Sequence, residues 1–180
     1  MKQTEVANGV DKSLPGGLAL TALAIPAKAQ AAPDAVAPTI TLQSNTELAS
    51  QAKALMEKAR EAPTGVASVT LNSYPGHTVM LVARAKTGPA EIHANWNDVM
   101  FVLDGEATEV TGGTMVGGTL DAATGETQGT SVEGGTRTPI AKGDVVHIPP
   151  GTPHWAVLAP GKTLVVCVVK VAAAGPAASK

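Results

Sequence analysis

The strongest constraint on the fold of this chain is the alternation of short apolar stretches with turn residues from Val66 onward. Gly, Pro, Asn and Asp residues separate these stretches, which are Val66–Leu71, Thr78–Ala85, Val99–Leu103, Val145–Ile148 and Thr163–Val171. Short strands separated by turns are typical of an antiparallel sandwich or barrel. The 19 glycines and 13 prolines among 180 residues likewise favour many turns over long helices.

Two features in the middle of the chain also indicate turns. Asp104-Gly105 lies between Val99–Leu103 and Glu106–Val110, and an Asp-Gly pair between two β stretches predicts a hairpin. The Thr-rich section after it contains three Gly-Gly pairs at irregular spacing, which we interpret as turns and not as a repeat.

One helix is predicted over residues 46–62. Ser44 and Glu47 have the spacing of a capping box, and Pro63 with Gly65 marks the end of the helix. Apolar residues recur between them at helical spacing, at Leu48, Ala52, Leu55, Met56 and Ala59. The narrow apolar stripe predicts a helix that packs on the main body.

The two ends of the chain are expected to lie outside the folded domain. Leu18–Ile25 is an apolar run followed by Pro26 and small residues, as in a signal peptide and its cleavage site. We therefore expect a signal peptide over 1–31, a linker over 32–45, a barrel over 63–171 and a flexible tail over 172–180. This predicts a periplasmic or secreted protein. Acidic residues offset the lysines at the start, so an Ala/Pro-rich tail on a cytoplasmic protein is the alternative.

Composition argues against several classes of function. The formal net charge is −2 and there is no basic cluster, so neither nucleic acid nor an anionic membrane is expected as the partner. No apolar run is long enough for a membrane-spanning helix. The one cysteine, Cys167, cannot form a disulfide within the chain.

Histidine and carboxylate residues are concentrated in two segments. In AEIHANWNDVMFVLDG, Glu91 and His93 are two residues apart, so on a strand they would point to the same side, and Asp98 follows. In GDVVHIPPGTPHW, Pro149 ends one strand, the chain turns, and His154 begins the next strand.

These segments resemble the paired motifs of the cupin superfamily. The second cupin motif is a glycine, five residues, Pro-x-Gly-x-x-His and then an Asn, and its spacing is matched by Gly143, Pro149, Gly151 and His154. Leu158 stands at the Asn position.

The first cupin motif has His-x-His, a Glu and a later glycine, and this chain matches it in part. Asp98 and Gly105 keep the last interval, so His93 takes the second histidine position and Glu91 replaces the first. In a rival register His93 comes first and Asn95 second, but Asp98 then follows too closely.

The resemblance implies an all-β fold, a double-stranded β-helix of the cupin or jelly-roll type with one N-terminal α-helix. It also implies a divalent metal inside the barrel, held by Glu91, His93, Asp98 and His154. Two imidazoles with carboxylate oxygens suit Fe, Mn, Zn or Ni. Glu91 could instead be a catalytic acid or base, and Asp98 could instead hydrogen-bond a neighbouring group.

The resemblance further implies a metal-dependent oxygenase, isomerase or lyase that acts on a small polar molecule. The alternative is a non-catalytic barrel that binds or senses a small ligand, and whether the chain is an enzyme stays open at this point. Because barrels of this superfamily commonly pair, a homodimer is expected.

Overall fold

A computed structural model describes residues 40–173. The chain divides into two units, Met1–Thr41 and Leu42–Lys180, and every helix and strand of the described residues lies in the second. The predicted signal peptide, most of the predicted linker and most of the predicted tail lie outside the described residues. No helix within residues 40–173 is long and apolar enough to cross a membrane.

The N-terminal helix α1 (Asn45–Glu61) begins and ends one residue before the predicted 46–62. Its capping box is present, because the Ser44 side chain accepts from the Glu47 backbone and the Glu47 side chain accepts from the Ser44 backbone. Leu55, Met56 and Ala59 are buried. They pack against sheet residues that include Leu81, so α1 covers part of the outside of the barrel.

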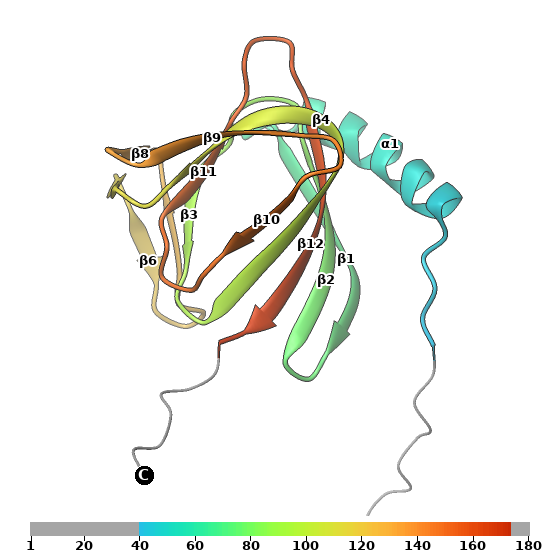
Figure 1. The fold of residues 1–180 in the computed structure, drawn as a ribbon, viewed down its shortest axis with the longest axis horizontal. Helices are drawn as coiled ribbons and strands as arrows, with labels where there is room; N and C mark the ends of the chain where they lie inside the picture. Colours follow the sequence, from blue (N-terminus) through green and yellow to red (C-terminus); the bar gives the residue numbers. More distant parts are fainter. Residues whose placement is uncertain (1–39, 174–180) are drawn as a thin grey trace, which may run out of the picture. The chain divides into compact units, whose positions relative to one another are not determined.

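The barrel is built from antiparallel strands in two facing layers (Figure 1). One layer has the order β1-β2-β12-β4-β10 and the other β9-β4-β11-β3-β7-β6, with β5 and β8 as a separate pair. The strands are β1 (Val66–Tyr74), β2 (His77–Arg84), β3 (Ala90–His93), β4 (Trp96–Thr111), β5 (Thr114–Val116), β6 (Thr119–Asp121), β7 (Glu126–Gly129), β8 (Ser131–Glu133), β9 (Thr136–Ala141), β10 (Val145–Ile148), β11 (His154–Val157) and β12 (Leu164–Ala172). This strand arrangement confirms the predicted all-β, double-stranded β-helix with one N-terminal helix.

The predicted hairpin at Asp104-Gly105 is wrong. β4 continues through both residues and curves over the top of the barrel (Figure 1). Residues before the bend pair with β12 and β10, whereas residues after it pair with β9 and β11. Gly105 has a φ of +82°, and a Cβ there would lie 2.0 Å from the Thr163 carbonyl oxygen. The Asp-Gly pair therefore bends one strand from the first layer into the second, because glycine permits this φ and this close approach.

The interior follows the two-residue period of the strands. In β12, Val166 and Val168 are buried, and Val166 packs with Met100 and Ile148 between the layers. Lys170 continues the same alternating row and is half-buried. A charged residue thus extends the apolar inner face of this strand.

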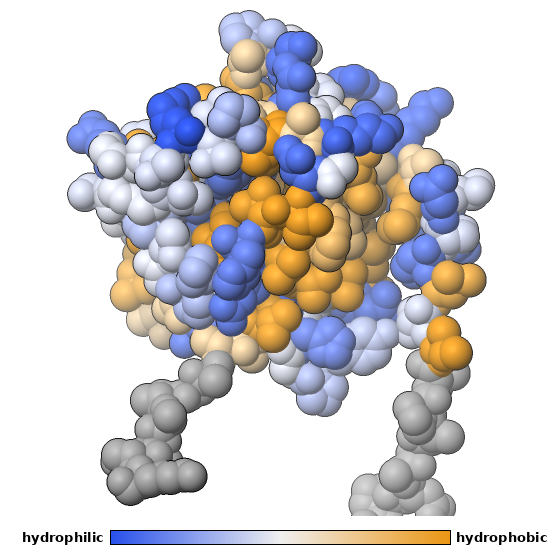
Figure 2. All heavy atoms as spheres, viewed as in Figure 1, coloured by the Kyte–Doolittle hydropathy of each residue, from blue (hydrophilic) through white to orange (hydrophobic). Residues whose placement is uncertain are grey.

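Apolar side chains also remain on the outside of the first layer. Figure 2 shows them gathered at the centre of the face over β10 and β12. Phe101 is paired with Val145 on one side and Cys167 on the other, and it is 41% exposed. Val145 is 59% exposed and Val171 39%. We call Phe101, Val145 and Val171 the outer apolar face.

Candidate metal and ligand site

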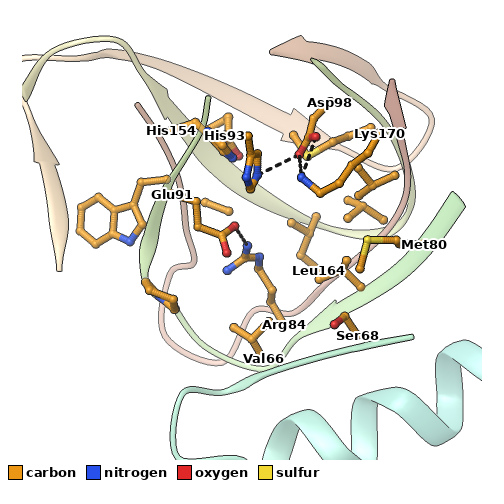
Figure 3. Close-up of a pocket in the computed structure, with 18 residues that line it drawn as sticks. Val66, Ser68, Met80, Arg84, Glu91, His93, Asp98, His154, Leu164 and Lys170 are labelled. Atoms are coloured by element: carbon orange, nitrogen blue, oxygen red, sulfur yellow. Dashed lines mark hydrogen bonds and ion pairs between the residues drawn. The ribbon is translucent and has the colours of Figure 1, made fainter. Parts of the chain in front are cut away.

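Strands β3 and β11 bring three potential metal ligands together inside the barrel. Glu91 and His93 lie two residues apart on β3, and His154, on the adjacent strand β11, pairs directly with Glu91. One potential ligand atom from each of these residues lies within 4.8 Å of the other two. Figure 3 shows the three side chains pointing into one cavity.

His154 presents a free ring nitrogen to this group. Its Nδ1 donates to the Thr152 carbonyl oxygen at 3.0 Å, so Nε2 carries the lone pair. Burial lowers the pKa of His154 and favours the neutral form. A neutral imidazole with one nitrogen oriented by a backbone carbonyl is the usual state of a metal-binding histidine.

His93 lies between two carboxylates. Its Nδ1 contacts Glu126 on β7, and its Nε2 lies 3.3 Å from Asp98 Oδ2 on β4. Burial lowers the pKa of His93, but the hydrogen bonds with Asp98 and Glu126 and the negative charge of Asp98 together outweigh burial, so the net shift is upward. In this arrangement the carboxylates favour a protonated His93, and a metal would have to replace a proton on its ring.

Asp98 reaches the same cavity but is not one of the three converging residues. Lys170 pairs with it across β12 and donates to both carboxylate oxygens, at 2.8 and 3.1 Å. Burial raises the pKa of Asp98, but the hydrogen bonds and positive charges of His93 and Lys170 together outweigh burial, so the net shift is downward and the carboxylate is ionised. Asp98 thus contacts one proposed ligand and is neutralised by a lysine.

Arg84 supplies a second positive charge on the inner face. It ends β2 between Val66 on β1 and Leu164 on β12, and its side chain is 12% exposed. Its Nη2 lies 3.3 Å from Glu91 Oε2, whereas its buried Nη1 has no hydrogen-bond partner among residues 40–173. This charged N–H group is therefore buried without an acceptor among the described residues.

Glu109 is a buried carboxyl group on the second half of β4. It is 2% exposed, and its Oε1 has no hydrogen-bond partner in the described part of the chain. Burial raises its pKa to about 7, against the lowering effects of Arg84 and a backbone hydrogen bond from Trp155. Glu109 can therefore exchange a proton near neutral pH.

These side chains line a cavity of about 130 Å³. Its charged and imidazole lining residues are Arg84, Glu91, His93, Asp98, Glu109, His154 and Lys170. The remaining wall is mostly aliphatic and includes Met80, Val82, Leu164, Val166 and Val168. The cavity is thus an apolar pocket with charged groups clustered around Glu91 and His93.

Sequence reasoning missed four residues of this site: Arg84, Glu109, Glu126 and Lys170. Alternation could have indicated two of them, because Arg84 continues the row of Met80 and Val82, and Lys170 continues the row of Val166 and Val168. No such pattern marks Glu109 or Glu126. Their place follows from the bend in β4 and from the pairing of Glu126 with His93.

The donor set fits a divalent transition metal. Two imidazoles and a carboxylate suit Zn, Fe, Mn or Ni, and such sets leave coordination positions open. The neutral His154 is in the form that binds metal, whereas His93 would have to lose a ring proton.

Comparisons with known proteins give structural resemblances of low sequence identity. No protein-family model matches the chain, and no curated protein matches it either. The polyketide cyclase RemF from Streptomyces resistomycificus is 20% identical, with a TM-score of 0.42 over 62% of this chain and 68% of that one.

Two further structures resemble the chain to a similar degree. A cupin 2 conserved barrel domain protein from Rhodopseudomonas palustris is 21% identical, with a TM-score of 0.43 over 62% of this chain and 63% of that one. An oxalate oxidase is 19% identical, with a TM-score of 0.45 over 62% of this chain and 53% of that one. The chain thus spans about half the length of the oxalate oxidase.

The strand arrangement makes this protein a double-stranded β-helix with an internal cavity. It resembles the cupin superfamily in the motif residues Gly143, Pro149, Gly151 and His154, and several of the similar structures bear cupin names.

Proposed function

We propose that this protein binds one divalent metal ion inside the barrel through Glu91, His93 and His154. The observation that carries the proposal is the convergence of these three side chains within 4.8 Å in a buried cavity. Asp98 is the fourth candidate from the sequence. It would either orient His93 through its contact with Nε2 or serve as a further ligand of the ion.

With a metal bound, the site would suit an oxygenase, isomerase or lyase reaction on a small polar molecule. When bound, the ion would act as a Lewis acid or an oxygen-activating centre. The chain's own residues would do the rest. The aliphatic wall would exclude water, and Glu109 would hold or release a proton at its unpaired Oε1. Glu91 would act as the general base if it is not a ligand.

A second function is favoured by one specific observation. Lys170 already neutralises Asp98, so the site has fewer free carboxylate donors than the sequence suggested. A non-catalytic barrel that binds a small ligand without metal would need no further carboxylate donors. That function predicts ligand-induced thermal stabilisation that persists in chelator.

The test of metal binding is metal analysis of histidine variants. The purified protein is loaded with Zn²⁺, Mn²⁺, Fe²⁺ or Ni²⁺, dialysed, and its metal content measured by mass spectrometry. We expect His93→Ala and His154→Ala each to lose the bound ion, because each removes one of three ligands. His147→Ala is the matched control, since His147 is exposed on β10 and contacts Asn97.

Three results would each count against the metal site. These are a wild type that retains no ion, variants that retain as much as the wild type, and a control that loses the ion equally.

We also propose that the protein forms a homodimer through the outer apolar face. Phe101, Val145 and Val171 remain exposed on one side of the sheet, where another protein surface could cover them. A second copy of this chain offers the same face, as a two-fold interface requires.

A further inference from the structure

We propose that the ligand of the cavity is a short aliphatic monocarboxylic acid whose carboxylate is bound by Arg84. This inference rests on the proposed function, since it takes the cavity beside Glu91, His93 and His154 as the ligand site. It adds the chemical class of the ligand and the residue that recognises it.

The Arg84 guanidinium is only partly paired within the protein. One of its nitrogens, Nη2, faces Glu91 at 3.3 Å, while Nη1 is buried without a partner among the described residues. Burying a charged donor without an acceptor is unfavourable, so the site favours a ligand that brings one. A carboxylate oxygen is the acceptor that forms the strongest hydrogen bond with a guanidinium.

Two cationic side chains, Arg84 and Lys170, line the cavity. Both oxygens of Asp98 already accept from the Lys170 ammonium group. Of the two cations, only Arg84 has a buried donor without an acceptor among the described residues. One free cationic donor, beside the carboxyl groups of Glu91 and Glu109, favours a single negative charge over a dicarboxylate or a phosphate.

Aliphatic side chains surround Arg84 and form most of the cavity wall. Val66 and Leu164 flank Arg84 on the neighbouring strands, and Met80, Val82 and Val168 extend the aliphatic surface. The cavity volume of about 130 Å³ equals that of roughly four water molecules in the liquid. A ligand with a short branched aliphatic body satisfies this wall and this volume.

Arg84 lies beside the candidate metal ligands. Glu91 is the residue that Arg84 contacts, and Glu91 also lies within 4.8 Å of the two histidine donors. Figure 3 shows Arg84 reaching up from the aliphatic floor of the cavity to Glu91. A carboxylate on Arg84 would therefore lie next to the candidate metal ligands.

The experiment compares isovalerate with isovaleramide, which has the same shape without the charge. Binding is measured by calorimetry and thermal shift on the full chain, once in chelator and once with Zn²⁺. We expect isovalerate to bind and to raise the melting temperature under both conditions, and the amide, malonate and inorganic phosphate to bind at least about tenfold more weakly.

Two variants at Arg84 test the residue itself. Arg84→Gln should weaken isovalerate about tenfold or more in chelator, where loss of metal cannot contribute. Arg84→Lys keeps a positive charge but lacks the planar pair of nitrogens, and it should bind more weakly than the wild type. Lys162→Gln removes an exposed lysine that pairs with Glu106, and it should bind like the wild type.

Several outcomes would overturn the inference. They are absence of isovalerate binding in chelator, equal binding of the amide, tighter binding of malonate or phosphate, and unchanged binding in either Arg84 variant. The metal content of the same samples separates the two proposals. Isovalerate binding by a protein that retains no ion after loading with Zn²⁺ and dialysis would defeat the metal site and leave the role of Arg84 standing.

Discussion

Glu109 is the most buried of the charged and histidine side chains in this barrel, and its protonation couples folding to pH. The folded protein holds the Glu109 proton until about pH 7, whereas a glutamate in the unfolded chain releases it near its ordinary pKa of 4.5. The folded state therefore binds more protons between these values, so stability falls as pH rises through that interval. The stability that protonated Glu109 contributes is fully present below the pKa that the residue has in the unfolded chain. It is lost as the pH rises past about 7.

Replacing Glu109 by Gln should remove this dependence. The free energy of unfolding of the wild type relative to Glu109→Gln should fall by on the order of 3 kcal/mol between about pH 4.5 and 8. Urea unfolding of both proteins in chelator, at a series of pH values, measures the difference. Glu133→Gln, on an exposed residue of β8, controls for the removal of a carboxylate. A difference between wild type and Glu109→Gln that does not change with pH would contradict the prediction.

At the residue scale, the spacing of residues within one strand predicts some contacts in the site but not those between distant strands. Glu91 and His93 could be paired from the sequence because residues two apart share one side of a strand. The contact of Asp98 with Lys170 joins positions that are far apart in the chain and adjacent across β12. Register between distant strands depends on the whole fold, so the sequence could not reveal that a lysine neutralises this carboxylate.

At the scale of elements, the bend in β4 makes a specific demand on Gly105. A Cβ at this position would lie 2.0 Å from the Thr163 carbonyl oxygen and 3.2 Å from Leu164 Cα, in addition to the cost of a positive φ. Gly105→Ala should therefore lower the free energy of unfolding by about 3 kcal/mol or more.

Gly161 provides a matched control for that substitution. Its φ is +76°, and a Cβ there would meet nothing within 4 Å. Gly161→Ala should then cost about 1–2 kcal/mol, the cost of backbone conformation alone. Denaturant unfolding of the two variants measures both losses. Equal losses would show that the close approach to Thr163 does not contribute.

Gly105 also explains why the predicted hairpin at Asp104-Gly105 was wrong. An Asp-Gly pair between apolar stretches predicts a turn on local grounds, since glycine readily adopts a positive φ. The local sequence does not reveal that Thr163 and Leu164 lie against the bend and that β9 and β11 are available to pair with residues 106–111. The helix α1 was predictable to within one residue because its capping box and end signals are local.

At the scale of the whole molecule, the outer apolar face governs association. If two copies pair through it, light scattering should give about twice the chain mass of 18.0 kDa. Val145→Glu should then yield the single-chain mass, because it places a charge within the apolar contact, beside Phe101. Leu120→Glu is the matched control, since Leu120 is an exposed apolar residue on β6, outside the outer apolar face. A wild type that is monomeric at all concentrations would remove the proposal.

The fold class was predictable at this scale because many weak patterns agree. Strand-length apolar stretches and frequent turn residues each favour an antiparallel barrel, and the spacing of Gly143, Pro149, Gly151 and His154 adds the resemblance to cupins. The cavity and its charge balance were not predictable, because inner and outer apolar positions look alike in the sequence.

The passage of β4 through both layers has a consequence for how the barrel opens. Because a single continuous strand carries hydrogen bonds to β12 and β10 before Gly105 and to β9 and β11 after it, neither layer can detach without breaking pairs of that strand. Backbone amides on both sides of the bend should then exchange with solvent at one common, slow rate, through opening of the entire barrel. Asp98 and Glu109, which lie on the two halves of this strand, would lose their places in the cavity in the same event.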